Sequence, residues 1–178
     1  MGSERSAPRR SDNQETVPMT CRTFFSAGYS EYVMFTRAAL EHMYLHVQHS
    51  RCAKEAGGEL FARVFDASCV VIDSASGPHL SDKRSRYSFL PDVDAGAKER
   101  LLQWEQGLHA VGLWHTHPEC VPTPSGPDRR TTEQYLRAFD GERARYFSVI
   151  LGNRGAHPVM TVLSVSNRGW TPWVEAGE

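Results

Sequence analysis

Apolar residues recur with helical spacing in three parts of the chain. We predict helices over residues 36–48, 97–106 and 127–139. In the first helix the apolar stripe repeats at i, i+3, i+4 and i+7, and it consists of Leu40, Met43, Tyr44 and Val47. In the last helix the stripe that should face the rest of the fold consists of Thr132, Tyr135, Leu136 and Phe139.

Short runs rich in β-branched and aromatic residues predict the strands. They lie within residues 23–36 and at residues 60–66, 69–73, 88–90, 109–115, 146–151 and 160–165. Alternation along the strand at 109–115 places Val111 and Leu113 on one face. The polar segment over residues 74–88 is expected to be a loop or an insertion. Because strands and helices are mixed, we expect an α/β or α+β fold, a single domain in which a curved mixed β-sheet is flanked by helices.

The length and composition limit the possible classes of function. A chain of 178 residues is expected to form one domain, here residues 19–178, after a flexible polar tail over residues 1–18. A formal net charge of −1 provides no basic surface for nucleic acid, and no apolar run reaches the length of a membrane span. We therefore expect neither a nucleic acid nor a membrane as a partner. The four cysteines are scattered, which fits a reducing cytoplasm better than a disulfide framework.

Two histidines and one aspartate form a candidate metal site. His115 and His117 are two positions apart on a predicted strand, so both imidazoles should point to the same side. Asp128 lies in the first turn of the following helix, at the head of its apolar stripe. Two imidazoles and one carboxylate leave a fourth tetrahedral position for water, as in catalytic zinc sites. These ligands suit zinc, while iron and manganese stay open as alternatives.

A hydrolytic site of this kind also needs a general base and a hydrogen-bond donor for the oxyanion. Glu55 and Glu59 flank a pair of glycines that allow close backbone approach, and the residue pattern alone does not decide between the two carboxylates. Ser125 is the candidate donor. Ser125 and Asp128 also have the spacing of a helix-capping box, a role that is compatible with catalysis.

These residues together resemble the signature of the JAB/MPN (JAMM) metallopeptidases, which is a distant glutamate, then His-[Ser/Thr]-His, seven residues, and Ser-x-x-Asp. The matching positions, without departure, are Glu55, His115, Thr116, His117, Ser125 and Asp128. The family places its glutamate before a Gly-rich strand start, so the resemblance assigns the base to Glu55. It also implies a zinc ion, a mixed curved sheet with flanking helices, and cleavage of ubiquitin-like proteins from lysines or tails.

Residues 55–139 are more specifically similar to bacterial JAB proteins, including the Cap3-type deconjugases of CBASS operons and related ubiquitin-like antiphage systems. The run GPHLSDKRSRYSFLPD and the proline-rich turn before Asp128 carry this similarity, and the first fifty residues match less well. The resemblance implies an isopeptidase or processing peptidase for a ubiquitin-like protein, or for a C-terminally conjugated partner such as a CD-NTase-like enzyme. Activating (E1-like) and conjugating (E2-like) proteins of the same operon are the further partners it implies.

Other functions remain as alternatives. A non-catalytic MPN scaffold would bind partners without cleaving them, and a JAMM hydrolase could instead act on sulfur-carrier or phage cell-wall peptides. The basic residues Lys83, Arg84 and Arg86 form either an ordinary solvated loop or, as the resemblance implies for insertions at this place, a contact surface for the protein partner.

Several further residues are interpreted as structural. His42, His46 and His49 lie opposite the apolar stripe of the first helix, so we expect them to face solvent rather than a second metal. Trp170 and Trp173 are expected to pack in the core or at its edge. Neither group therefore adds a second site to the prediction.

Overall fold

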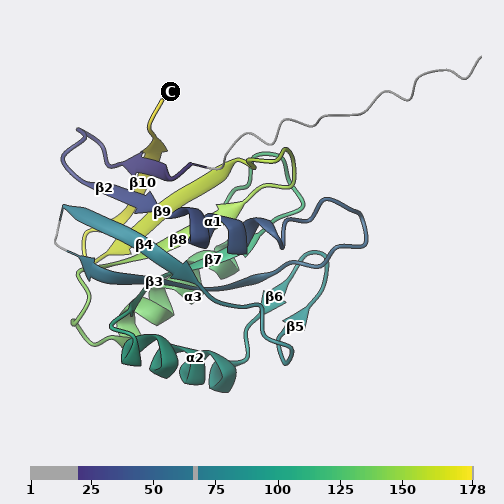
Figure 1. Ribbon diagram of the computed structural model, residues 1–178, viewed down its shortest axis with the longest axis horizontal. Helices are drawn as coiled ribbons and strands as arrows, with labels where there is room; N and C mark the ends of the chain where they lie inside the picture. Colours follow the sequence, from purple (N-terminus) through teal and green to yellow (C-terminus); the bar gives the residue numbers. More distant parts are fainter. Residues whose placement is uncertain (1–19, 66–67, 178) are drawn as a thin grey trace, which may run out of the picture.

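Strands dominate the part of the chain that the computed structural model describes, residues 20–65 and 68–177 (Figure 1). The strands are β1 (Arg22–Phe25), β2 (Tyr32–Phe35), β3 (Gly57–Phe65), β4 (Cys69–Ala75), β5 (Lys83–Arg84), β6 (Phe89–Leu90), β7 (His109–Thr116), β8 (Arg145–Leu151), β9 (Met160–Ser166) and β10 (Gly169–Glu175). The helices are α1 (Arg37–Tyr44), α2 (Val93–Glu105) and α3 (Gly126–Ala138). Each predicted helix and strand has its counterpart, whereas β5 and β10 were not predicted. The expected tail, residues 1–18, lies outside the described residues.

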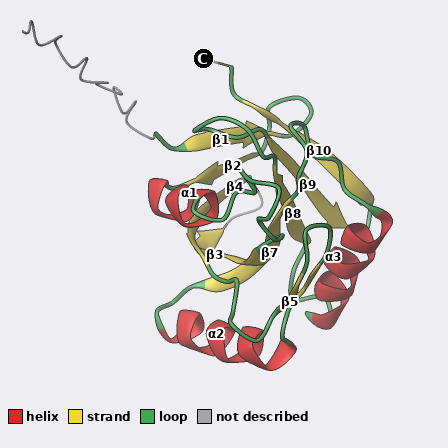
Figure 2. Ribbon diagram, turned by 90° about the vertical axis from the view of Figure 1, so that its right-hand side faces the viewer, coloured by secondary structure: helices red, strands yellow, loops and turns green. Residues whose placement is uncertain are grey.

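Eight strands form a closed barrel in the order β1-β10-β9-β8-β7-β3-β4-β2 (Figure 2). The sheet is therefore a closed barrel rather than the expected curved sheet. The expected mixture of strand directions is confirmed: β2–β4 and β7–β8 are parallel and the other pairs of the barrel are antiparallel. Closure depends on pairs such as Phe24 with Glu175, which are distant in sequence. Such pairing removes the unpaired sheet edges. The periodicity of residues within one strand does not predict this closure.

The barrel and α1 share one core. Thr36 caps α1 by accepting a hydrogen bond from the Ala39 backbone N–H, which starts the helix where the apolar stripe begins. Leu40 and Met43 are fully buried in the cluster that the strands enclose, which confirms the predicted stripe. The core thus supports β7 from the inside of the barrel, on the face opposite the one that bears the candidate metal ligands.

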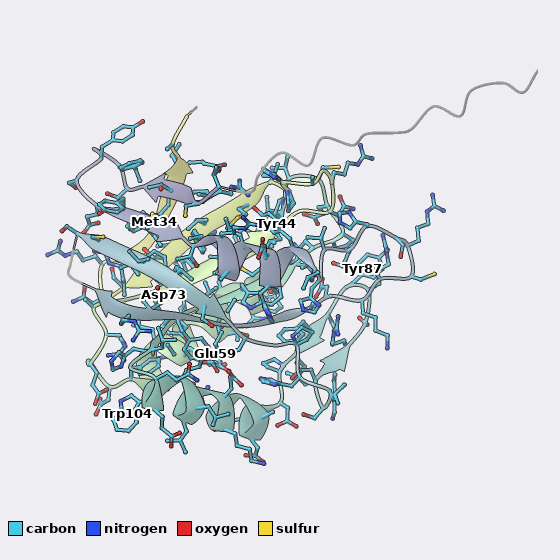
Figure 3. The ribbon with its side chains drawn as sticks, in the orientation of Figure 1. Met34, Tyr44, Glu59, Asp73, Tyr87 and Trp104 are labelled. Carbon is cyan, nitrogen blue, oxygen red and sulfur yellow. The ribbon has the colours of Figure 1, made fainter. Side chains whose placement is uncertain are left out.

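The other two helices lie outside the barrel and differ in how they are attached (Figure 2). Thr132 of α3 is buried, and the rings of Tyr135 and Phe139 pack on Tyr146 of β8, which confirms the predicted stripe. In α2, by contrast, Gly96 is the one buried residue, and Trp104 projects away from the barrel (Figure 3). No helix within the described ranges has the length and apolar character needed to cross a bilayer.

Candidate metal centre

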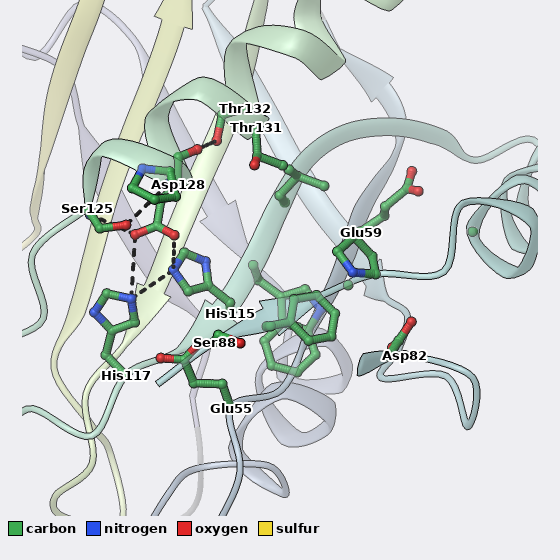
Figure 4. Close-up of a pocket in the computed structure, with 18 of the residues that line it drawn as sticks. Glu55, Glu59, Asp82, Ser88, His115, His117, Ser125, Asp128, Thr131 and Thr132 are labelled. Carbon is green, nitrogen blue, oxygen red and sulfur yellow. Dashed lines mark hydrogen bonds and ion pairs between the residues drawn. The ribbon is translucent and has the colours of Figure 1, made fainter. Parts of the chain in front are cut away.

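The end of β7 positions the two histidines. β7 lies between β3 and β8, so its backbone is held on both sides, with His115 opposite Gly57 of β3 and Ile150 of β8. The backbone N–H of His117 extends this pairing by donating to Leu151 O at 2.9 Å. As predicted, both imidazoles lie on the same side, and their Nε2 atoms are 3.0 Å apart (Figure 4).

A β-bulge in β7 corrects one detail of the prediction. The register of the β3–β7 pair shifts so that Val111 is an extra residue between Ala110 and Gly112. Val111 is consequently buried in the main core, whereas Leu113 lines a pocket together with the histidines. The expectation that Val111 and Leu113 share a face is wrong because a bulge resets the alternation of side chains.

The first turn of α3 positions the carboxylate. Ser125 Oγ accepts from the Asp128 backbone N–H at 3.3 Å, and the Ser125 backbone N–H donates to Asp128 Oδ2 at 2.7 Å. The predicted capping box is therefore confirmed. It also aims the carboxylate, because Oδ1 lies 3.4 Å from His115 Nε2 and Oδ2 lies 3.6 Å from His117 Nε2.

These donor atoms fit a tetrahedral zinc ion. Two ligand atoms about 2.0–2.1 Å from zinc at tetrahedral angles are about 3.4 Å apart, and the three separations here are 3.0, 3.4 and 3.6 Å. A metal-binding histidine usually donates its other ring N–H to a carboxylate or carbonyl. His117 Nδ1 is buried without a hydrogen bond within the described chain, and Glu119 Oε2 lies 3.9 Å from it. Glu119 was not predicted, although its place two positions after His117 was an available signal.

The electrostatics of the cluster favour a cation. Burial raises the pKa of Asp128, but hydrogen bonds from His115, His117 and Ser125 outweigh it and hold that pKa well below its usual range. Burial lowers the pKa of His117, but the Asp128 carboxylate and the charges of Glu55 and Glu119 raise it overall. The ionised carboxylate thus attracts positive charge to the histidine nitrogens at physiological pH.

Glu55 faces the same nitrogens from the side opposite Asp128 (Figure 4). Its side chain is buried, and this burial raises the pKa of Glu55 to about 7, with the His117 ring opposing and Asp128 and Glu119 adding to the rise. The glycines that follow allow the close approach we predicted. A Cβ on Gly58 would lie 1.9 Å from Ser76 O, so any other residue there would force the start of β3 and the Ser76 backbone apart.

Glu59, the other carboxylate flanking the glycines, has a different environment. It is buried between β3 and α2 (Figure 3), and it forms an ion pair and hydrogen bond with Arg100 of α2. Burial raises the pKa of Glu59 to about 7 as well, although Arg100 opposes the rise. The structure thus distinguishes two carboxylates that the residue pattern left equal, because only Glu55 lies beside the candidate ligands.

One pocket of about 510 Å³ contains all five predicted site residues. Glu55, His115, His117, Ser125 and Asp128 line one part of it, and Glu59, Leu113 and Tyr135 are among the residues that line the rest. Ser125 is exposed there, and its hydroxyl oxygen accepts from the Asp128 backbone N–H. The structure therefore brings a two-histidine, one-carboxylate cluster together with a second carboxylate and a hydroxyl group.

The basic residues of the hairpin formed by β5 and β6 have separate environments. Arg84 Nε donates to Glu55 O at 2.5 Å, and Arg86 Nη1 donates to Ser50 O at 2.9 Å, so both guanidinium groups make contacts within the chain. Lys83 is exposed. Two of the three basic residues are thus tied to neighbouring segments of the chain, and contact of this loop with a protein partner stays a prediction.

The histidines of the first predicted helix are also placed differently from the prediction. His42 and His46 are half-buried, and their rings lie 5.9 and 5.8 Å from the ring of Trp114. The expectation of solvent exposure is wrong for these two and correct for His49. The reason is that the Trp114 ring reaches both histidines and that the Gly77 carbonyl hydrogen-bonds to His42 Nε2, contacts that the spacing of residues in the first helix does not reveal.

The chain is similar to two curated bacterial proteins, each named CD-NTase/cGAS isopeptidase. It is 34% identical to one from Pseudomonas aeruginosa over 132 residues, which cover 67% of this chain and 83% of that protein. It is 30% identical to one from Enterobacter hormaechei over 155 residues, which cover 84% of this chain and 83% of that protein.

A solved structure and a family model also match the chain. A solution structure of a protein from Desulfitobacterium hafniense superposes with a TM-score of 0.58 and 20% identity, covering 78% of this chain and 87% of that one. The family described as prokaryotic homologs of the JAB domain matches residues 36–173, which include every residue of the pocket named above. This chain therefore belongs to the prokaryotic JAB family.

Proposed function

We propose that the protein is a zinc-dependent JAMM-type isopeptidase. It would remove or process a ubiquitin-like protein, or a C-terminally conjugated partner such as a CD-NTase-like enzyme, in a bacterial antiphage conjugation system of the cytoplasm. The observation that carries the proposal is the convergence in one pocket of three ligand side chains with Glu55 and Ser125. The names of the two curated relatives support the substrate class.

Each site residue would have one chemical task. His115, His117 and Asp128 would hold the zinc ion, which supplies Lewis acidity and lowers the pKa of a water to about 7. Glu55, whose buried carboxylate has a pKa of about 7, would take the proton of the attacking water and deliver it to the leaving amine. Ser125 would donate its hydroxyl hydrogen to the developing oxyanion.

The surface beside the pocket supports a protein as substrate. Tyr87 and Phe89 line the pocket, and the nearby apolar residues Leu90 and Val93 are 60% and 69% exposed. The exposed side chains of α2 continue from there to Trp104, which is 61% exposed. A folded body that docks on apolar surface while its extended tail enters the pocket would use both features.

Cleavage of fusion proteins tests this proposal. Each fusion carries the C-terminus of a candidate ubiquitin-like or CD-NTase-like partner ahead of a reporter. Wild type, wild type with a zinc chelator, and Glu55→Gln are compared, since the amide keeps the shape of the carboxylate but cannot accept the proton. We expect only the untreated wild type to release the reporter.

The alternatives predict other results in the same assay. A folded, zinc-loaded wild type that cleaves no fusion but binds one of them tightly would support the non-catalytic scaffold. Cleavage of sulfur-carrier or cell-wall peptides, with no cleavage of the fusions, would support a different substrate for the same site. Undiminished cleavage by Glu55→Gln would refute the role given to Glu55.

A further inference from the structure

A buried glutamine joins three segments around the pocket. Gln48 follows α1, and only 1% of its surface is exposed. Its side-chain Nε2 donates to Ala53 O at 3.2 Å and to Arg86 O at 2.9 Å, and its Oε1 accepts from Thr116 Oγ1 at 3.3 Å. Gln48 thus contacts the segment that leads to Glu55, the hairpin of β5 and β6, and the end of β7.

The partners of Gln48 fix the orientation of its amide. Two carbonyl oxygens can only accept, so they require the NH₂ side of the amide. Ala56 N–H donates to Thr116 Oγ1 at 3.1 Å, so the hydroxyl hydrogen of Thr116 is directed to Gln48 Oε1. The donors and acceptors therefore follow one direction, from Ala56 N–H through Thr116 and Gln48 to Ala53 O. If the Gln48 amide were rotated by a half-turn, its oxygen would face two carbonyl oxygens, which cannot donate to it.

This chain of bonds connects the two functional halves of the pocket. Thr116 stands between His115 and His117, and Ala56 directly follows Glu55. The backbone N–H of Thr116 also donates to Ala56 O at 2.9 Å, so Thr116 holds both polar groups of the Ala56 backbone. Gln48 and Thr116 thereby set the distance between the Glu55 backbone and the histidines.

We propose that Gln48, acting through Thr116, is a positioning residue that holds Glu55 at its working distance from the metal-binding histidines. The role rests on the proposed function, because it concerns the same reaction. Neither side chain touches the substrate or the reacting atoms. Their loss is therefore expected to lower the turnover rate while zinc content and substrate affinity are maintained.

Steady-state kinetics on the zinc-loaded, full-length protein test the role. Gln48→Met and Thr116→Val keep the side-chain shape and remove the hydrogen bonds, and kcat is expected to fall about ten- to a hundredfold with KM and zinc content unchanged. Thr116→Ser keeps the hydroxyl and is expected to retain the wild-type kcat. Because the two residues act in series, the double variant Gln48→Met/Thr116→Val should lose no more than the worse single variant.

A control variant separates positioning from general destabilisation. Ser164→Ala removes the hydroxyl that accepts from Trp173 Nε1 at 3.0 Å, a buried hydrogen bond between β9 and β10 and outside the pocket. It is expected to lower Tm and to leave kcat unchanged. Equal losses of kcat in Ser164→Ala and Gln48→Met would overturn the proposal.

Amide hydrogen exchange provides a measurement that does not depend on the reaction. The Ala56 amide is expected to exchange at least about tenfold faster in Gln48→Met and Thr116→Val than in wild type or Ser164→Ala. Unchanged exchange, wild-type kcat in both variants, or a parallel loss of zinc and kcat would each overturn the role of Gln48. If the wild type cleaves no substrate, the proposed function fails, while the exchange of Ala56 still decides whether the connection exists.

Discussion

The two halves of the pocket are built in different ways. The ligand cluster comes from one strand end and the helix that follows it, and a capping box within a single helical turn aims Asp128. Glu55, by contrast, is placed by contacts with distant segments, such as the bond between Ala56 and Thr116 across 60 positions of sequence. Metal binding should therefore tolerate changes around Glu55, and turnover should not.

The largest effect is expected from removing a ligand charge. Asp128→Asn keeps the size of the side chain but removes its negative charge and replaces one of the two carboxylate oxygens that face the histidines. Zinc affinity should therefore fall by about a thousandfold, which is more than the ten- to a hundredfold typical of outer-shell changes. Metal content after dialysis and kcat are measured together, and both should be lost. A variant that stays active with zinc bound would show that the cluster has another ligand.

Glu55→Gln is expected to lower turnover without lowering zinc content, which would distinguish the Glu55 half of the pocket from the ligand half. The amide cannot accept a proton, so kcat should fall by about 10²–10⁴-fold, the usual contribution of a general base. Zinc content should equal that of wild type, because Glu55 is absent from the ligand cluster. Loss of zinc in this variant would mean that the two halves are not independent.

The same contrast explains what the sequence could predict. Spacing of two on a strand and a Ser-x-x-Asp helix start are local features, and they correctly brought His115, His117 and Asp128 together. Closure of the barrel, the bulge at Val111 and the burial of His42 against Trp114 arise from contacts between distant segments. No periodicity within one element encodes such contacts, and this is also why Gln48 was not singled out.

Glu59 provides a matched comparison for Glu55, because both are buried, line the pocket and have a pKa of about 7. Glu59 is paired with Arg100 and does not lie beside the ligands. Glu59→Gln should therefore retain kcat and zinc while changing the stability of the fold. Measured loss of turnover in this variant, with KM constant, would assign Glu59 a role in the chemistry.

The pH dependence of stability should identify the Glu59 contribution. Burial raises its pKa from 4.5 to about 7 on folding, so the native state binds the proton more tightly. This contribution is fully present below pH 4.5 and is lost as the pH rises to about 7, with a total on the order of 3 kcal/mol. Urea unfolding at several pH values should show a smaller decline over that window in Glu59→Gln. An identical decline in both proteins would contradict the assignment.

The smallest loss of turnover is expected from a change in the hairpin of β5 and β6. It tests whether the basic residues position Glu55 or bind the partner. Arg84 donates to Glu55 O at 2.5 Å, but the Glu55 N–H donates independently to Ser85 O at 2.7 Å, so the segment keeps one of its two anchors in Arg84→Ala. We expect kcat to fall about three- to tenfold with KM unchanged. Lys83→Ala, which removes an exposed charge, should leave kcat unchanged. If Arg84→Ala instead raises KM at constant kcat, the hairpin acts through the partner, and the placement of Glu55 depends on fewer contacts than the structure suggests.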